Sequence, residues 1–93
     1  MPAFTTRVEL HKASDDDYDV LHEAMENNGF SRFITGGDDV MYHLPTAEYN
    51  YVGDKTKNDV LDLAKAAATR TDKKFAVLVT ESDGRVWVGL MKA

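Results

Sequence analysis

The pattern of hydrophobic and polar residues divides this 93-residue chain into six segments, in the order strand, helix, strand, strand, helix, strand. Between Phe4 and Leu10, apolar and polar residues alternate, which is typical of a strand with one buried face. In two later segments the apolar residues recur at every third or fourth position, as they do on the buried side of a helix. The changes of period follow the order of a β-α-β-β-α-β unit.

Both expected helices carry recognisable start signals. Ser14, followed by three aspartates, is a typical N-cap, because its hydroxyl accepts from a free backbone N–H and carboxylates favour the positive end of the helix dipole. Gly29 is expected to end this helix, since glycine takes the left-handed conformation at little cost. Thr56, with Asp59 three residues later, resembles a capping box at the start of the second helix.

The chain between the helices is expected to form two strands. Its extended pieces are, in order, residues 30–35, 40–44 and 48–52. Gly36–Asp39 interrupts the first strand with a turn or a bulge, and Pro45 suits the turn before the second because it cannot donate to a ladder. Tyr49 and Tyr51 fall on one face of the second strand, which favours a place in the core over a platform for stacking bases.

These segments predict an α+β, ferredoxin-like βαββαβ sandwich that forms a single domain over residues 1–93. Right-handed crossovers give an antiparallel sheet of order 4-1-3-2 with both helices on one face. The strand that comes last along the chain, Phe75–Thr80, stands first in that order and so lies at an edge, although both its faces are apolar. An extra C-terminal strand at Val86–Val88 is expected to cover this edge, within its own chain or by pairing with a second copy. Trp87 would anchor the resulting homodimer.

Composition narrows the classes of protein to which the chain could belong. It contains no cysteine, which excludes disulfides and thiolate metal sites. Apolar runs such as Ala76–Val79 are far too short to span a membrane, and the N-terminus lacks the features of a signal peptide. We therefore expect a cytoplasmic protein with no membrane partner.

The charges are unevenly distributed along the chain. The net charge is −5, which argues against broad, non-specific binding of phosphates, and no DNA partner is expected. Residues 13–54 hold ten acids and one base, whereas residues 55–93 hold five acids and eight bases. The acidic part is either a solvated face or a surface that binds a protein. The basic part contains a cluster suited to phosphates or an acidic surface: Lys65, Arg70, Lys73 and Lys74.

Two histidines and two arginines are the candidate catalytic residues. His11 ends the first strand on its polar side and His43 lies on the hairpin, and each is a candidate general acid or base. Arg7, which is expected on the helix-free face of the sheet, and Arg32 are candidates for neutralising a phosphate or the charge of a phosphorane. The ordinary alternatives are surface histidines and ion pairs between the arginines and nearby glutamates.

No cofactor or metal is expected. Asp15–Asp17 and His11 together have ligand groups for a divalent cation, but helix capping already explains the three acids. No two histidines have the spacing of a helical zinc site, and His22 is expected to be an ordinary surface residue on the flank of the first helix.

Several stretches of the chain resemble the GhoS family, small antitoxins of type V toxin–antitoxin systems. The matching features are Gly29-Phe30-Ser31 at the helix end, the Leu44 turn, the Tyr49/Tyr51 strand, Leu61-Asp62-Leu63 in the second helix, and the Phe75/Val77/Val79 strand entering Thr80. The resemblance implies a ferredoxin-like fold related to that of the CRISPR-associated Cas2 proteins, and an endoribonuclease that destroys a toxin's messenger RNA. It names no catalytic residues, and where a Cas2-like site has an acid ending the first strand, this chain has His11 nearby.

Two functions follow as hypotheses. The first is an endoribonuclease antitoxin that cleaves single-stranded RNA without a metal. Arg7 and Arg32 would hold phosphate in this enzyme, and His11 or His43 would move protons as the ribose 2′-hydroxyl attacks. The alternative is a non-catalytic interaction or regulatory module, such as a phage-related one, that binds a protein through its acidic face.

Overall fold

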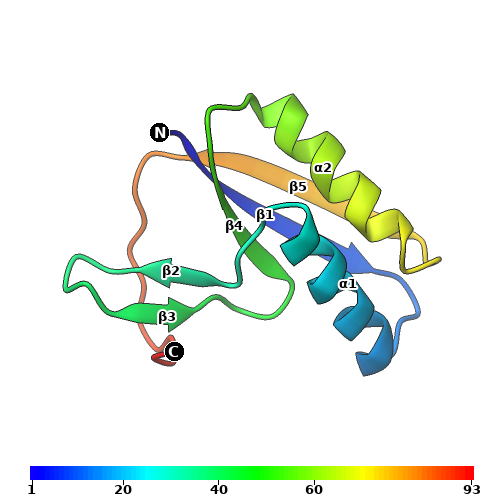
Figure 1. Cartoon of the computed structure of the whole chain (residues 1–93). Coiled ribbons are helices and arrows are strands. Elements are labelled where there is room, and N and C mark those ends of the chain that lie inside the picture. The colour runs from blue at the N-terminus through cyan, green and yellow to red at the C-terminus, as the bar shows by residue number, and fades with distance from the viewer.

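A computed structural model describes residues 1–93, and it contains five strands and two helices (Figure 1). Their bounds are β1 Ala3–Leu10, α1 Asp15–Asn27, β2 Phe33–Thr35, β3 Met41–His43, β4 Glu48–Val52, α2 Lys57–Thr69 and β5 Phe75–Ser82. The strands form a three-stranded antiparallel sheet of order β4-β1-β5 and a separate two-stranded sheet of β2 and β3. The protein is thus a small α+β fold with two sheets.

Both helices cover the same face of the three-stranded sheet, as expected. Alternate residues of β1 are buried on that face, where they meet the apolar sides of α1 and α2, and Figure 1 shows the two helices side by side. Four small or β-branched residues of α2 are fully buried, which lets this helix approach the sheet closely. The core consists of Phe4, Val8, Leu10, Leu21, Ala24, Met25, Phe30, Tyr49, Val60, Ala64, Ala67 and Ala68.

The helix termini follow the sequence signals. Ser14 and Thr56 are N-caps, and each forms a reciprocal capping box with the aspartate three residues later. Gly29 takes a left-handed conformation (φ +93°) after α1, and the N–H of Phe30 donates to the carbonyl of Met25 at 3.0 Å. That pair of features is a Schellman motif, which ends the helix and turns the chain toward the sheet.

The strand order agrees with the expectation for three strands and differs for the fourth. β5, β1 and β4 occupy the first three positions of the predicted 4-1-3-2 order. The chain at Ser31 pairs with β4 only through an isolated bridge to Asn50 and then leaves the sheet. Gly36–Asp39 is the turn of a hairpin, so 40–44 pairs back onto β2 instead of prolonging one interrupted strand. The Ser31 hydroxyl accepts from the N–H of Phe33 at 3.1 Å, and this local turn redirects the chain.

The prediction of an extra C-terminal strand at Val86–Val88 was wrong. Residues 84–88 form no strand, and the tail leaves β5 and runs past β2 and β3, as Figure 1 shows. It reaches β3 with its last residues, where the N–H of His43 donates to Met91 O at 2.8 Å and the N–H of Ala93 donates to Met41 O at 2.9 Å. The edge of β5 is therefore uncovered within the chain, and Leu78 is 65% exposed there.

One polar group in the core has no partner. Thr6 is fully buried on the helix-facing side of β1, and its Oγ1 makes no hydrogen bond. An unsatisfied buried hydroxyl costs about 1–3 kcal/mol, whereas valine has nearly the same shape without the polar atom. We expect Thr6→Val to raise the free energy of unfolding by about 1–2 kcal/mol in urea titrations. Thr80→Val, at an exposed position of β5, is the control and should change it little. A loss of stability in Thr6→Val would contradict this account.

Candidate functional site

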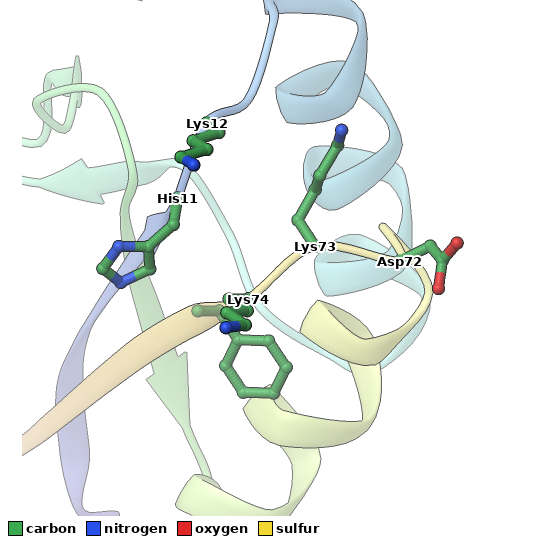
Figure 2. A pocket seen from close by; sticks show the side chains of 6 residues that line it. His11, Lys12, Asp72, Lys73 and Lys74 are labelled. Carbon is green, nitrogen blue, oxygen red and sulfur yellow. The ribbon is translucent and has the colours of Figure 1, made fainter.

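A basic hollow of about 770 Å³ lies where β1 ends and β5 begins. Its lining residues are His11, Lys12, Asp72, Lys73, Lys74 and Phe75, which Figure 2 shows as sticks. Three lysines and a histidine thus surround one open space in a protein whose net charge is −5. The local charge has the opposite sign to that of the whole chain.

Strand pairing brings the two halves of the hollow together. β1 and β5 pair with Leu10 opposite Phe75, and one step further the N–H of His11 donates to the carbonyl of Lys74 at 2.8 Å. The N–H of Leu10 also donates to the hydroxyl of Tyr18 at 3.1 Å, which ties this end of β1 to α1. Because these bonds fix the backbone, they hold the Cα atoms of His11 and Lys74 next to each other on neighbouring chain segments.

The backbone is strained on both sides of the hollow. Lys12 and Asp72 both have positive φ, 52° and 58°, in a region that non-glycine residues seldom adopt. The loop holding Asp72 is anchored by Thr71, which is nearly buried and whose hydroxyl donates to Ala68 O at 2.7 Å. Such strain persists only where surrounding contacts impose it, and it is often found at functional sites.

The three lysines are not equivalent. Lys73 Nζ lies 3.7 Å from the Asp17 carboxylate, and this is the only salt bridge in the protein. The Ser14 backbone N–H donates to the same carboxylate, and this bond lowers the pKa of Asp17. Figure 2 shows Lys73 and Asp72 pointing away from the His11 imidazole. Lys12 and Lys74 are therefore the unpaired cations beside His11.

Of the four predicted catalytic residues, only His11 lies in this hollow. Arg7 is exposed on the helix-free face of β1 and lines a separate hollow of about 160 Å³. It forms no ion pair with the neighbouring Glu9 or Glu48. The structure does not gather the four residues around one surface, because neither hollow includes Arg32 or His43.

Arg32 and His43 belong to the β2–β3 hairpin and its approach. The N–H of Leu44 donates to the carbonyl of Arg32 at 2.8 Å, and the His43 ring packs against Phe33 with 4.8 Å between centroids. His43 therefore packs within the hairpin, and it does not lie beside the lysines of the hollow.

His22 is not the ordinary surface residue expected from the sequence. Its Nδ1 shares a hydrogen bond of 2.5 Å with the hydroxyl of Tyr49, which is fully buried. Burial lowers the pKa of His22, the positive charge of Arg32 lowers it further, and burial raises the pKa of the Tyr49 hydroxyl. Both groups therefore favour their neutral forms, and the bond joins the half-buried His22 of α1 to the core residue Tyr49 of β4.

The sequence found part of the basic site. Lys73 and Lys74 belong to the basic cluster that the sequence marks as suited to phosphates or an acidic surface, but its other two members, Lys65 and Arg70, do not line the hollow. Lys12 was missed, although its position directly after His11 is the signal that marks it. No three histidine, aspartate or glutamate side chains lie close enough together to hold a metal ion.

Comparisons with known proteins assign no family to this arrangement. No protein-family model matches the chain, and no curated protein matches it either. None of its helices has both the length and the apolar character needed to cross a bilayer.

Proposed function

We propose that this protein is an antitoxin-like endoribonuclease that acts in the cytoplasm and cleaves the single-stranded messenger RNA of a toxin. The observation that carries the proposal is the hollow in which His11 lies beside the unpaired cations of Lys12 and Lys74. A proton-accepting imidazole beside two ammonium groups fits phosphodiester chemistry, in which a base activates the nucleophile and cations neutralise the phosphorane. The resemblance to the GhoS family supports the same class of reaction.

The chemistry needs only groups present in the chain and the substrate. His11 takes the proton from the ribose 2′-hydroxyl while the 2′-oxygen attacks the adjacent phosphorus. The bond from phosphorus to the 5′-oxygen breaks, that oxygen takes a proton from water, and the His11 imidazolium returns its proton to the hydroxide that this leaves. The products are a 2′,3′-cyclic phosphate and a 5′-hydroxyl. Lys12 and Lys74 stabilise the negative charge that builds up on the phosphoryl oxygens. DNA lacks the nucleophile and would not be cleaved.

We propose that the fold is ferredoxin-like, with its fourth strand position reduced to a bridge. The order β5-β1-β4 and the placement of both helices on one face support this relation. The Ser31–Asn50 bridge marks where a fourth strand would continue. The uncovered edge of β5 is the surface through which we propose that two copies associate.

The direct test is an incubation of the purified protein with labelled RNA in the presence of EDTA. We expect single-stranded RNA to be cleaved to cyclic-phosphate products. The same sequence in an RNA duplex should resist cleavage, and a DNA oligonucleotide of that sequence should stay intact. Absence of both binding and cleavage over a broad set of transcripts would overturn the proposal. It would favour instead a protein partner for the acidic side of α1.

A matched pair of lysine variants tests whether the hollow holds the phosphates. Lys74→Ala should weaken RNA binding and reduce the slope of log affinity against log salt by about 0.7, the value for one phosphate contact to a single strand. Lys65→Ala removes the same charge from an exposed position of α2 outside the hollow and should leave the slope unchanged. Equal effects of the two variants would place the RNA elsewhere.

A further inference from the structure

The C-terminal tail fixes an arginine over the helix-free face of the sheet. Arg85 Nε donates to Thr5 Oγ1 and its Nη2 donates to Asn50 Oδ1, both at 2.9 Å. Thr5 and Asn50 are cross-strand partners of β1 and β4, so the guanidinium spans two strands. A guanidinium carries five N–H donors, and Arg85 forms no ion pair, which leaves donors free for a ligand.

The next inward-facing residue of the tail is aromatic. Trp87 meets Tyr42 edge to face, with 5.4 Å between ring centroids, and lies half-buried, whereas the intervening Val86 is 99% exposed. A Cβ added to Gly36 would lie 2.7 Å from Asp38 Oδ1, 3.2 Å from the Tyr42 ring and 3.3 Å from the indole, so the turn that carries Gly36 packs closely against both rings. Trp87 is thus held in place while part of its surface stays accessible.

Arg85 and Trp87 together line a hollow of about 480 Å³ that contains no acidic residue. Its other polar side chains are those of Asn50, Thr35 and Ser82, which supply an amide and two hydroxyls. A guanidinium without an ion pair can bind a phosphate through its remaining donors, an indole stacks on a nucleobase, and amides and hydroxyls bond to base edges or sugars. This combination fits a nucleotide.

The position of the hollow relates it to the site at His11. Arg85 meets β1 at Thr5, which is six residues from His11, or about 20 Å along a strand. Arg7 lies between them, points to the same helix-free face by the alternation of the strand, and forms no ion pair. We propose that Arg85 and Trp87 form a second RNA-binding site, which holds a nucleotide of the strand whose cleaved phosphate lies at His11. This inference rests on the proposed endoribonuclease function.

Trp87 is the only tryptophan, so its fluorescence reports on this site alone. The probe is a single-stranded RNA of roughly ten nucleotides, within the range bound by single-strand-binding domains, with 2′-O-methyl groups that prevent cleavage. We expect it to quench the fluorescence of the wild-type protein. Trp87→Leu should bind the labelled RNA about tenfold more weakly, as expected for loss of one stacked base, and Arg85→Lys should also weaken it. Lys92→Ala, an exposed cation of the same tail, is the control and should bind normally.

The outcomes separate this inference from the proposed function. If wild-type protein cleaves RNA but its fluorescence is unchanged and Trp87→Leu binds equally well, only the second site is wrong. If wild-type protein neither binds nor cleaves RNA, both proposals fail. If uridine monophosphate quenches as strongly as the oligonucleotide at equal concentration, the hollow binds free nucleotides and the path along β1 is wrong. Unchanged circular dichroism and amide spectra of the sheet would show that the variants are folded.

Discussion

Replacement of His11 by alanine should lower RNA cleavage about 10²–10⁴-fold, the usual contribution of a general base. The affinity for RNA should change much less, because Lys12, Lys74 and the helix-free face still hold the phosphates. The measurement is the single-turnover rate on a labelled transcript in EDTA, together with the affinity for the uncleavable 2′-O-methyl RNA. Loss of rate with retained affinity would identify His11 as a catalytic residue.

The matched control for this prediction is His43→Ala. His43 packs against Phe33 on the hairpin and does not line the hollow, so its variant should cleave at the wild-type rate. Equal cleavage by wild-type protein and the His11 variant would remove His11 from the mechanism and indicate a contaminating nuclease. A rate that falls only in the His43 variant would move the site to the β2–β3 hairpin.

The acidity of the whole chain does not conflict with binding an anion. Many of the acids lie on α1, and the first of them already serve its N-terminus, where Asp17 forms a capping box with the N-cap Ser14 and pairs with Lys73. Charges farther away are screened by salt over about 8–10 Å, so a phosphate at His11 responds mainly to the nearest lysines. Local arrangement, and not net charge, therefore decides which ligand this surface can accept.

Local patterns predicted the parts of the fold that depend on local forces. The alternation in β1 marked its buried face because side chains of a strand alternate between its two sides. Ser14 and Thr56 marked both helix starts because each cap bonds within three residues of itself. The neighbouring positions of β5, β1 and β4 followed from the handedness of the two crossovers.

The parts that could not be predicted depend on contacts between distant residues. The path of the tail is set by Arg85, which bonds to Thr5 from 80 positions away. No pattern within the tail shows that Arg85 and Trp87 contact residues of the two sheets. The apolar residues Val86–Val88 are instead typical of an ordinary strand. The same holds for the His22–Tyr49 bond, since a histidine on the flank of a helix looks exposed until its partner strand is placed.

The candidate site was predictable only in part for a related reason. His11 was identified from its position at the end of a polar strand face, and Lys73 and Lys74 from their charge. Their convergence depends on the pairing of Leu10 with Phe75, which joins the two ends of the chain. Lys65 and Arg70 are also basic, but Lys65 lies on α2 and Arg70 is its C-cap residue, and neither lines the hollow.

Truncation of Tyr49 should have the largest effect on stability. Tyr49 is the largest fully buried side chain, and its ring meets Phe30 edge to face with 6.4 Å between centroids. Replacing a buried aromatic residue by alanine costs about 3–5 kcal/mol, which approaches the whole stability of a typical small domain. We therefore expect Tyr49→Ala to be partly or fully unfolded, as measured by urea titration of the circular dichroism signal.

Two further variants divide this effect into its causes. Tyr49→Phe keeps the ring but removes the hydrogen bond to His22, and it should cost about 1 kcal/mol. Tyr51→Ala removes a half-buried ring from the same face of β4 and should cost less than Tyr49→Ala, because less apolar surface is lost from the core. If Tyr51→Ala lowered the free energy of unfolding as much as Tyr49→Ala, packing around Tyr51 would matter to the core as much as packing around Tyr49. If Tyr49→Phe alone unfolded the protein, the bond between α1 and β4 would outweigh the packing of the ring.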